Sequence, residues 1–227
     1  MIEFKAVGHR YGDHRVLEHI DLTLPEQRVG IIGANGSGKS TLARMINGLV
    51  TPTSGKVLVD GLDVAAEAAA VRRRVGFVFP DPEAQIVMPT VAEDVAFSLR
   101  RHKLGKQERA EMVAAALEEI GLAGFDEHPA HRLSSGQKQM LALAAILVTG
   151  PSILVCDEPT TLLDRRNARQ VTARIEALDQ QVVLVTHHLD LLRGWERVIV
   201  IDEGRVVADG SPDETISFYC DRMDRAG

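Results

Sequence analysis

The stretch RVGIIGANGSGKSTLARMING, residues 28–48, decides the fold. A short apolar run of strand type comes first and a glycine-rich turn follows. Leu42, Met45, Ile46 and Leu49 then recur at helical spacing, with Gly48 near the expected end of the helix. The turn fits the pattern G-x-x-x-x-G-K-[ST], which is specific only when a strand precedes it and a helix follows. Both conditions hold, so the stretch predicts a βα unit with a phosphate-binding loop in an α/β fold.

This loop contains the groups that phosphate binding needs. Its glycines let backbone N–H groups wrap the phosphates, and the N-terminus of the following helix favours negative charge. Lys39 can reach the β- and γ-phosphates, and Ser40 can ligate Mg²⁺. A chance glycine turn would not need the strand, the lysine, the serine and the helix together. The residues expected to bind the nucleotide here are Gly33, Asn35, Gly36, Ser37, Gly38, Lys39, Ser40 and Thr41.

Two more strand-like runs end in groups that can act on phosphates. The run ILVCDEP ends in Asp157 and Glu158, and VVLVTHH delivers His187 and His188 to its end. In P-loop enzymes an aspartate at this place holds Mg²⁺, and an adjacent glutamate can polarise the water that attacks the γ-phosphate. A solvated strand end is the alternative for the acidic pair, and a packed or solvated side chain is the alternative for the histidines.

The remaining patterns predict a β lobe at the N-terminus and a helical middle. Alternating apolar residues over 1–29 are typical of antiparallel strands, and 51–61 predicts a turn and a strand. The segment 91–121 is expected to be helical, with a glycine as its stop signal. The run VIVIDEGRVVADG predicts a hairpin that turns at Glu203 and Gly204.

Composition narrows the class of protein. The 227 residues are 45% hydrophobic, which is enough for a sizeable core, and the net charge of −6 gives no overall attraction to nucleic acid. The longest purely apolar run, 140–148, is far shorter than the roughly 20 residues of a membrane-spanning helix, and no signal segment is seen at the N-terminus. A cytoplasmic location is therefore expected. Cys156 and Cys220 lack metal-ligand or redox spacing and are interpreted as reduced thiols.

Taken in order, GANGSGKST, LSSGQ, ILVCDEPT, LLD and VTH resemble the nucleotide-binding subunit of an ATP-binding cassette (ABC) ATPase. The most diagnostic part is LSSGQ, residues 133–137, a short helix upstream of the acidic strand. The resemblance implies one domain over 1–227: a P-loop cassette with a mainly parallel core sheet and an antiparallel β lobe (about 1–85 and 150–227), and a helical subdomain (about 86–149). It also implies hydrolysis of ATP with Mg²⁺.

The resemblance further implies that two subunits pack head to tail, so that LSSGQ of one chain closes on the ATP held by the other. A helix follows the motif, and its N-terminal amides and dipole can face a phosphate. A serine N-cap alone would explain the serines but not the glycine and the glutamine. The residues implied to face the partner's nucleotide are Ser134, Ser135, Gly136 and Gln137.

Single positions follow from the same resemblance. Tyr11 matches the aromatic residue that stacks on adenine, and Asp164 matches the acidic residue that communicates between the two sites. His187 matches the switch histidine. The implied catalytic residues are Lys39, Glu158 and His187, and the implied metal ligands are Ser40 and Asp157.

Two positions depart from the family pattern. Pro80 stands where the family places a glutamine that reaches Mg²⁺ and the attacking water, and proline offers neither a side-chain amide nor an N–H. Either water or a neighbour completes the metal site, or hydrolysis is slower and depends more on the partner. His188 replaces an acidic residue that commonly follows the switch histidine.

The segment PDPEAQIVMPTVAEDVAFSL, residues 80–99, is similar to the corresponding region of energy-coupling factor (ECF) importers of vitamins and metal ions. There, Asp81, Pro82 and Gln85 fall in an extra short helix that meets the transmembrane coupling subunit. From the residues alone, DPEAQ can cap and start a helix. The apolar residues 86–88 suit either a partner helix or the core.

The resemblance implies a set of partners: a second ATPase subunit in a homodimer, a transmembrane coupling protein and a substrate-binding membrane protein, with no nucleic acid. It implies a peripheral position at the inner face of the cell membrane. The chain ends soon after residue 214, without the longer C-terminal domain of shared-module ATPases, which favours a dedicated system. The pattern looks most like the ATPase of biotin uptake, and cobalt or nickel uptake is the second candidate.

Two other classes of protein compete with the importer. A soluble cassette ATPase acting on DNA or ribosomes usually has two cassettes in one chain or a long coiled-coil insertion, and neither is seen in these 227 residues. A monomeric P-loop kinase or GTPase would explain the first loop but would leave LSSGQ without a role.

Overall fold

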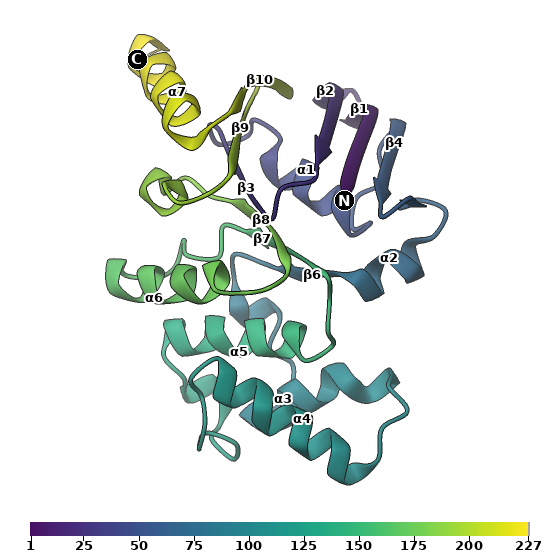
Figure 1. Ribbon diagram of the computed structural model, residues 1–227, viewed down its shortest axis with the longest axis vertical. Helices are drawn as coiled ribbons and strands as arrows, with labels where there is room; N and C mark the ends of the chain where they lie inside the picture. The colour runs from purple at the N-terminus through teal and green to yellow at the C-terminus, as the bar shows by residue number, and fades with distance from the viewer. Residues whose placement is uncertain (227) are drawn as a thin grey trace.

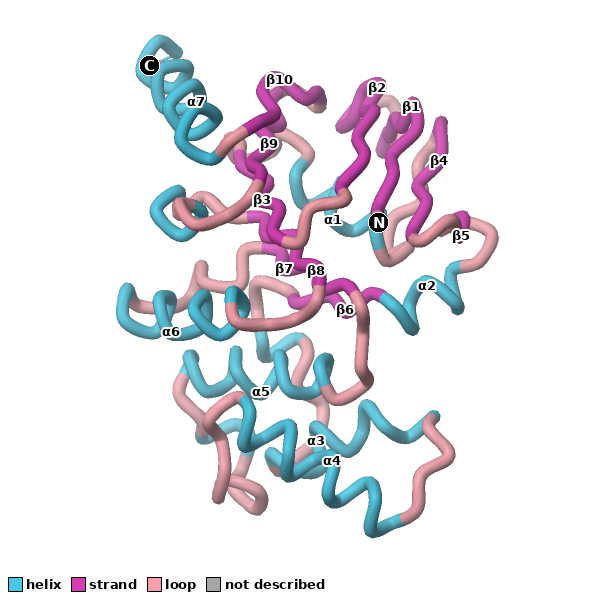
Figure 2. Tube along the Cα trace, in the orientation of Figure 1, coloured by secondary structure: helices cyan, strands magenta, loops and turns pink. Residues whose placement is uncertain are grey.

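Two β-sheets lie against helix α1 (Lys39–Ile46), and a group of helices lies beyond the larger sheet (Figures 1 and 2). The computed structural model describes residues 1–226. The expected strand, glycine-rich turn and helix are present as β3 (Arg28–Ile32), the loop 33–38 and α1. Helix α1 buries Leu42, Met45 and Ile46 of the predicted apolar stripe. The fourth member, Leu49, was wrongly included, because the helix ends at Ile46 and Leu49 is 48% exposed.

The smaller sheet is antiparallel, with the strand order β2-β1-β4-β5. Its strands are β1 (Ile2–Tyr11), β2 (His14–Leu24), β4 (Ser54–Val59) and β5 (Leu62–Asp63). The alternating pattern of the N-terminal lobe is therefore confirmed as a sheet. Strands β1 and β2 form a hairpin in which Tyr11 pairs with His14, so both side chains stand at its tip.

The larger sheet has the order β10-β9-β3-β8-β7-β6, and only the β9–β10 pair is antiparallel. Its remaining strands are β6 (Val75–Val78), β7 (Ile153–Asp157), β8 (Gln181–Val185), β9 (Arg197–Asp202) and β10 (Arg205–Gly210). The predicted hairpin at Glu203 and Gly204 is confirmed as the β9–β10 turn. Because β3, β7 and β8 are parallel neighbours, their carboxyl ends meet at one edge, where ligands bind in sheets of this kind.

Three helices in the lower part of Figure 1 pack around an apolar cluster of their own. They are α3 (Val91–Ser98), α4 (Lys106–Glu119) and α5 (Ser135–Leu147). The helical prediction over 91–121 is right in type, but the segment is interrupted. A 3₁₀ turn, η2 (Leu99–Arg101), and a short loop precede Gly105, which has an extended backbone at the N-cap of α4.

Helix α6 (Arg165–Glu176) is amphipathic and connects β7 to β8. Two other helices were not predicted from the sequence, α2 (Ala68–Arg74) and α7 (Pro212–Ala226). The three arginines before β6 belong to the last turn of α2, where cations interact favourably with the helix dipole. Helix α7 projects at one corner of the molecule and carries the C-terminus (Figure 1).

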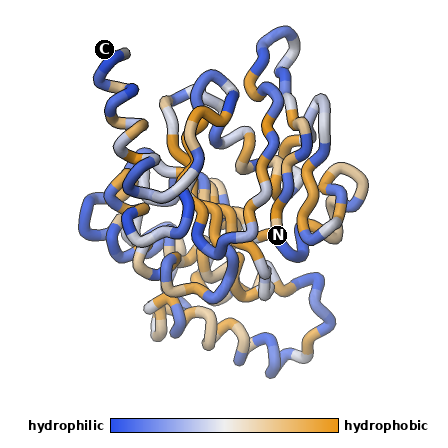
Figure 3. Tube along the Cα trace, turned by 45° about the horizontal axis from the view of Figure 1, so that its top comes forward, coloured by the Kyte–Doolittle hydropathy of each residue, from blue (hydrophilic) through white to orange (hydrophobic). Residues whose placement is uncertain are grey.

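Apolar residues concentrate in the strands of the larger sheet and hydrophilic residues in the surrounding loops (Figure 3). Cys156 is buried in β7, and burial raises the pKa of its thiol, which suits an unreactive core position. Cys220 is exposed, and both thiols are free. Within residues 1–226, no helix combines the length and the apolar character needed to cross a membrane.

Candidate active site

The phosphate-binding loop connects the end of β3 to the first turn of α1. Lys39 is only 6% exposed, and its Nζ donates to the carbonyl oxygens of Gly33 and Ala34 at 2.8 Å each. Burial lowers the pKa of Lys39, and the carboxylates of Glu158 and Asp157 oppose that shift. Only glycine fits at position 33, because a Cβ atom there would lie 2.0 Å from the carbonyl oxygen of Ile201.

Ser40 and Asp157 meet beside this loop, although they are 117 residues apart in the chain. The Ser40 hydroxyl donates to Oδ1 of Asp157 at 2.7 Å, and the Asp157 side chain is 0% exposed. Arg44, on the next turn of α1, donates from Nη2 to the other carboxylate oxygen at 3.2 Å. A hydroxyl and a carboxylate are oxygen ligands suited to Mg²⁺, which usually takes one or two protein groups together with phosphates and water. The two side chains therefore fit the predicted metal site.

Glu158 and His187 form a second pair at the same edge of the sheet. Glu158 follows β7 with a left-handed backbone (φ 51°), and its N–H donates to the carbonyl oxygen of Val185 at 2.9 Å. Its Oε2 lies 2.6 Å from Nδ1 of His187, which follows β8. The hydroxyl of Thr161 donates to the same oxygen at 3.3 Å. The parallel neighbours β7 and β8 thus place a carboxylate and an imidazole in direct contact.

His188 lies next to this pair. Its ring centre is 4.1 Å from that of His187, and its N–H donates to the Thr186 hydroxyl. The structure thus places a second imidazole where an acidic residue is usual. It shows no contact between His188 and Glu158.

One pocket of about 340 Å³ is lined by all the residues predicted to hold the nucleotide except Gly33 and Ser37. We call it the nucleotide pocket, and its lining residues are Tyr11, His14, Val16, Asn35, Gly36, Gly38, Lys39, Ser40, Thr41 and Glu158. Tyr11 is 53% exposed, and its ring and that of His9 form a T-shaped pair with 4.5 Å between ring centres. His14 was not predicted, although its position opposite Tyr11 at the end of a two-residue loop offered a signal.

The LSSGQ loop does not line the nucleotide pocket of its own chain. Its residues begin α5, where Ser134 is the N-cap. Ser134 and Gln137 form a capping box: Gln137 N–H donates to the Ser134 hydroxyl oxygen at 3.3 Å, and Ser134 N–H donates to Gln137 Oε1 at 2.9 Å. The expectation that capping leaves the glutamine unexplained is therefore wrong, because both side chains have local partners.

Asp164 caps the N-terminus of α6. Its Oδ1 accepts from the backbone N–H of Asn167 at 2.8 Å, and its Oδ2 accepts from the side-chain amide of the same residue at 2.9 Å. The structure therefore places the predicted communicating residue at the end of the loop that follows Glu158.

Residues 81–85 form the short helix that the sequence predicted. Asp81 caps η1 (Pro82–Ala84) by accepting from Glu83 N–H at 2.9 Å, and Pro82 is buried. The Gln85 amide turns back onto the end of β6, where it accepts from Phe79 N–H at 2.8 Å and donates to the Phe77 carbonyl at 3.3 Å. Gln85 therefore fixes the segment around Pro80.

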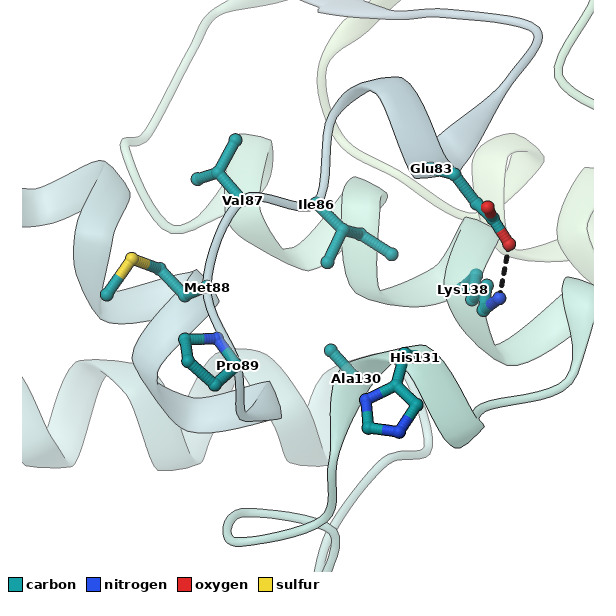
Figure 4. Close-up of a pocket in the computed structure, with 8 residues that line it drawn as sticks. All are labelled: Glu83, Ile86, Val87, Met88, Pro89, Ala130, His131 and Lys138. Carbon is teal, nitrogen blue, oxygen red and sulfur yellow. Dashed lines mark hydrogen bonds and ion pairs between the residues drawn. The ribbon is translucent and has the colours of Figure 1, made fainter.

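The apolar residues after η1 line an open groove (Figure 4), although Ile86 also packs against the apolar cluster of the helical group. We call it the 86–89 groove; it holds about 560 Å³ and is lined by Glu83, Ile86, Val87, Met88, Pro89, Ala130, His131 and Lys138. Val87 is 59% exposed. An ion pair between Glu83 and Lys138 closes one end and joins η1 to α5.

Asp94 stabilises the backbone of residues 87–88 in the groove, a role that the sequence analysis did not predict. Its buried Oδ1 accepts from the N–H groups of Val87 and Met88, at 2.7 and 2.9 Å. Burial raises the pKa of Asp94, while these two hydrogen bonds oppose the shift.

A phosphate-binding loop, a serine–aspartate pair and a glutamate–histidine pair at adjacent strand ends define a P-loop nucleoside triphosphatase. A family model described as ABC transporter matches residues 17–161. The chain belongs to the ABC transporter family, as an ATP-hydrolysing subunit of the energy-coupling factor type.

Named relatives agree with this placement. The chain is 43% identical to the biotin transport ATP-binding protein BioM of Rhizobium etli, over 96% of this chain and 97% of the relative. It is 39% identical to the energy-coupling factor transporter ATP-binding protein EcfA1 of Lactiplantibacillus plantarum, over 94% of this chain and 80% of the relative.

Solved structures show the same fold. CbiO1 from Clostridium perfringens, part of the ABC transporter complex CbiONQ, matches with a TM-score of 0.87 and 31% identity, over 98% of this chain and 93% of that one. The ATP-binding cassette MJ0796, solved as a dimer in a post-hydrolysis state with ADP and Pi, matches with a TM-score of 0.80 and 30% identity, over 93% and 99% of the two chains. The predicted fold class is thereby confirmed.

Proposed function

We propose that this chain supplies the energy for an ECF-type importer, with biotin as the first candidate cargo and cobalt or nickel as the second. The observation that carries the transport proposal is the exposed 86–89 groove, which lies beside the helix that begins with LSSGQ. The likeness to BioM supports biotin. A role on DNA or ribosomes would leave the groove without an occupant.

The residues of the nucleotide pocket divide the work of hydrolysis. Lys39 exchanges its two carbonyl acceptors for oxygens of the β- and γ-phosphates, and Tyr11 stacks on the base. Ser40 and Asp157 would hold Mg²⁺, which when bound neutralises charge on the phosphates. Glu158 accepts a proton from the attacking water, and His187 holds that carboxylate in place through the 2.6 Å contact.

A second copy of the chain completes each site in this proposal. The LSSGQ loop lies at a helix N-terminus, which favours a phosphate, and it is absent from its own chain's nucleotide pocket. Packing two copies head to tail places Ser134, Ser135 and Gly136 over the partner's γ-phosphate. The dimeric state of the MJ0796 cassette supports this arrangement.

The 86–89 groove is the proposed contact for a transmembrane coupling protein. Its apolar lining suits a helix with an apolar face, and the Glu83–Lys138 pair offers both charges at one end. Asp81, Pro82 and Gln85 act here mainly by shaping η1. The chain would then sit at the cytoplasmic face of the membrane, in a complex that also contains a substrate-binding membrane protein.

Affinity purification from detergent-solubilised membranes of the host tests the proposal. The chain is expected to bring along a small polytopic protein and a substrate-binding membrane protein, whose bound ligand identifies the cargo. Val87→Asp should lose both partners and keep ATP binding, whereas Leu49→Asp, a similarly exposed apolar position outside the groove, should keep both. Recovery of only ribosomes or nucleic-acid proteins would reject transport, and retention of partners by Val87→Asp would reject the groove.

A further inference from the structure

Asn167 makes more contacts with Asp164 than a helix cap needs. The cap itself is the bond from Asn167 N–H to Oδ1 of Asp164, at 2.8 Å. The side-chain amide adds a second bond to Oδ2, at 2.9 Å. One residue therefore occupies both oxygens of the Asp164 carboxylate and fixes its orientation.

The same side chain packs against the LSSGQ loop. A Cβ atom on Gly136 would lie 3.0 Å from both Cγ and Oδ1 of Asn167, and Gly136 is buried. A larger residue at position 136 would therefore be tight against Asn167, whose side chain would have to shift by a few tenths of an ångström. The side chain of Asn167 consequently has Asp164 on one side and the backbone of the LSSGQ loop on the other.

The surroundings of Asn167 lie at the boundary between the helical group and the sheet. A cleft of about 520 Å³ there is lined by residues of α5, of α6 and of the end of α4. Ser134, Gly136 and Gln137 contribute from one side, and Asn167 and Gln170 from the other. Apolar residues of both helices, Leu143 of α5 with Val171 and Ile175 of α6, share one buried cluster, and the contact between Asn167 and Gly136 adds to this packing at the LSSGQ loop.

We propose that Asn167 is a positioning residue that ties the LSSGQ loop to Asp164, so that closure of the loop on the partner's ATP carries Asp164 with it. This inference rests on the head-to-tail dimer of the proposed function. A role limited to starting α6 would need only the backbone N–H of Asn167, which every residue except proline supplies. The side-chain bond and the contact with Gly136 are what distinguish the two roles.

The test uses the Glu158→Gln chain, in which slow hydrolysis lets the ATP-bound dimer accumulate. Sedimentation measures its ATP-dependent dimerisation, and titration under dilute, monomeric conditions measures its affinity for ATP. Adding Asn167→Ala should weaken dimerisation about tenfold, because each dimer contains two of these links. ATP affinity of the monomer should stay unchanged. The matched control is Gln170→Ala, which removes an exposed amide lining the same cleft and should leave both values unchanged.

Hydrolysis gives a second readout with Glu158 intact. Asn167→Ala should hydrolyse ATP slowly at low protein concentration and recover when the concentration is raised, since the defect lies in assembly. If Asn167→Ala fails to fold, Asn167→Asp keeps the size and the backbone cap but loses the amide donor. Dimerisation equal to that of the Glu158→Gln parent would overturn the inference alone. A Glu158→Gln chain that stays monomeric with ATP would overturn the head-to-tail proposal as well.

Discussion

Replacing Arg44 with methionine should destabilise the protein chiefly when nucleotide and metal are absent. Arg44 is the one cation within hydrogen-bonding distance of the buried Asp157 carboxylate among residues 1–226, at 3.2 Å. Coulomb's law at an effective dielectric of about 20 gives about 5 kcal/mol for this separation. The arginine is 39% exposed, so screening reduces the net loss to about 1–2 kcal/mol.

Thermal unfolding with and without Mg²⁺-ATP is the assay. In a chelator, Arg44→Met should lower Tm by about 2–8 °C, from about 2–4 °C per kcal/mol for a chain of this size. With saturating Mg²⁺-ATP the difference in Tm between Arg44→Met and the parent should shrink, because the metal supplies a positive charge next to Asp157 in place of Arg44. Arg72→Met, at an exposed arginine of α2, controls for the loss of a surface cation. Equal losses of Tm in both conditions would refute the idea that arginine and metal compensate the same carboxylate.

Three other substitutions test separate parts of the structure. Asp94→Ala removes the acceptor of two partly buried N–H groups and should lower the free energy of unfolding by about 2 kcal/mol in urea titrations. Because folding raises the pKa of Asp94, the free energy of unfolding should fall as pH rises from the ordinary carboxyl range through that pKa. Asp94→Asn should remove this dependence on pH. An unchanged dependence would exclude Asp94 as its source. His14→Ala should weaken ATP and ADP binding about fivefold in calorimetry, whereas His19→Ala, an exposed histidine paired with Asp21, should not; equal affinities would remove His14 from the nucleotide pocket. Pro80→Gln should change the basal ATPase rate or its coupling to transport, and an unchanged rate at saturating Mg²⁺ with unchanged transport would contradict that expectation.

Local sequence predicts those parts of the site that one short segment contains. Residues 28–48 form strand, loop and helix in unbroken order, so their spacing alone indicates the phosphate-binding loop. The pairing of Ser40 with Asp157, 117 residues away, needed the further rule that parallel strands end at one edge.

Contacts set by tertiary packing left no comparable pattern in the sequence. Arg44 is one of several polar residues on an amphipathic helix, so nothing local marks it as the partner of Asp157, 113 residues away. Asn167 stands in a run of arginines, and nothing local marks it as a neighbour of Gly136. Asp94 is similar, since an acidic residue in a first helical turn is expected for its dipole alone.

Two features could have been predicted with more attention to helix starts. Ser211, Pro212 and the following acidic residues have the composition of a helix N-terminus, which identifies the beginning of α7. The pair Ser134 and Gln137 likewise fits the capping-box pattern.

Helix α5 carries two surfaces within its first turn. Ser135 is its first residue, and Lys138, at the end of the 86–89 groove, follows three positions later, about 4.5 Å along the axis. A helix turn is stiff, so a force applied to the Lys138–Glu83 pair displaces the LSSGQ loop with almost no loss over that distance. If a coupling protein binds the groove as proposed, no long relay to the LSSGQ loop is needed, because a single helical turn contains both points of contact.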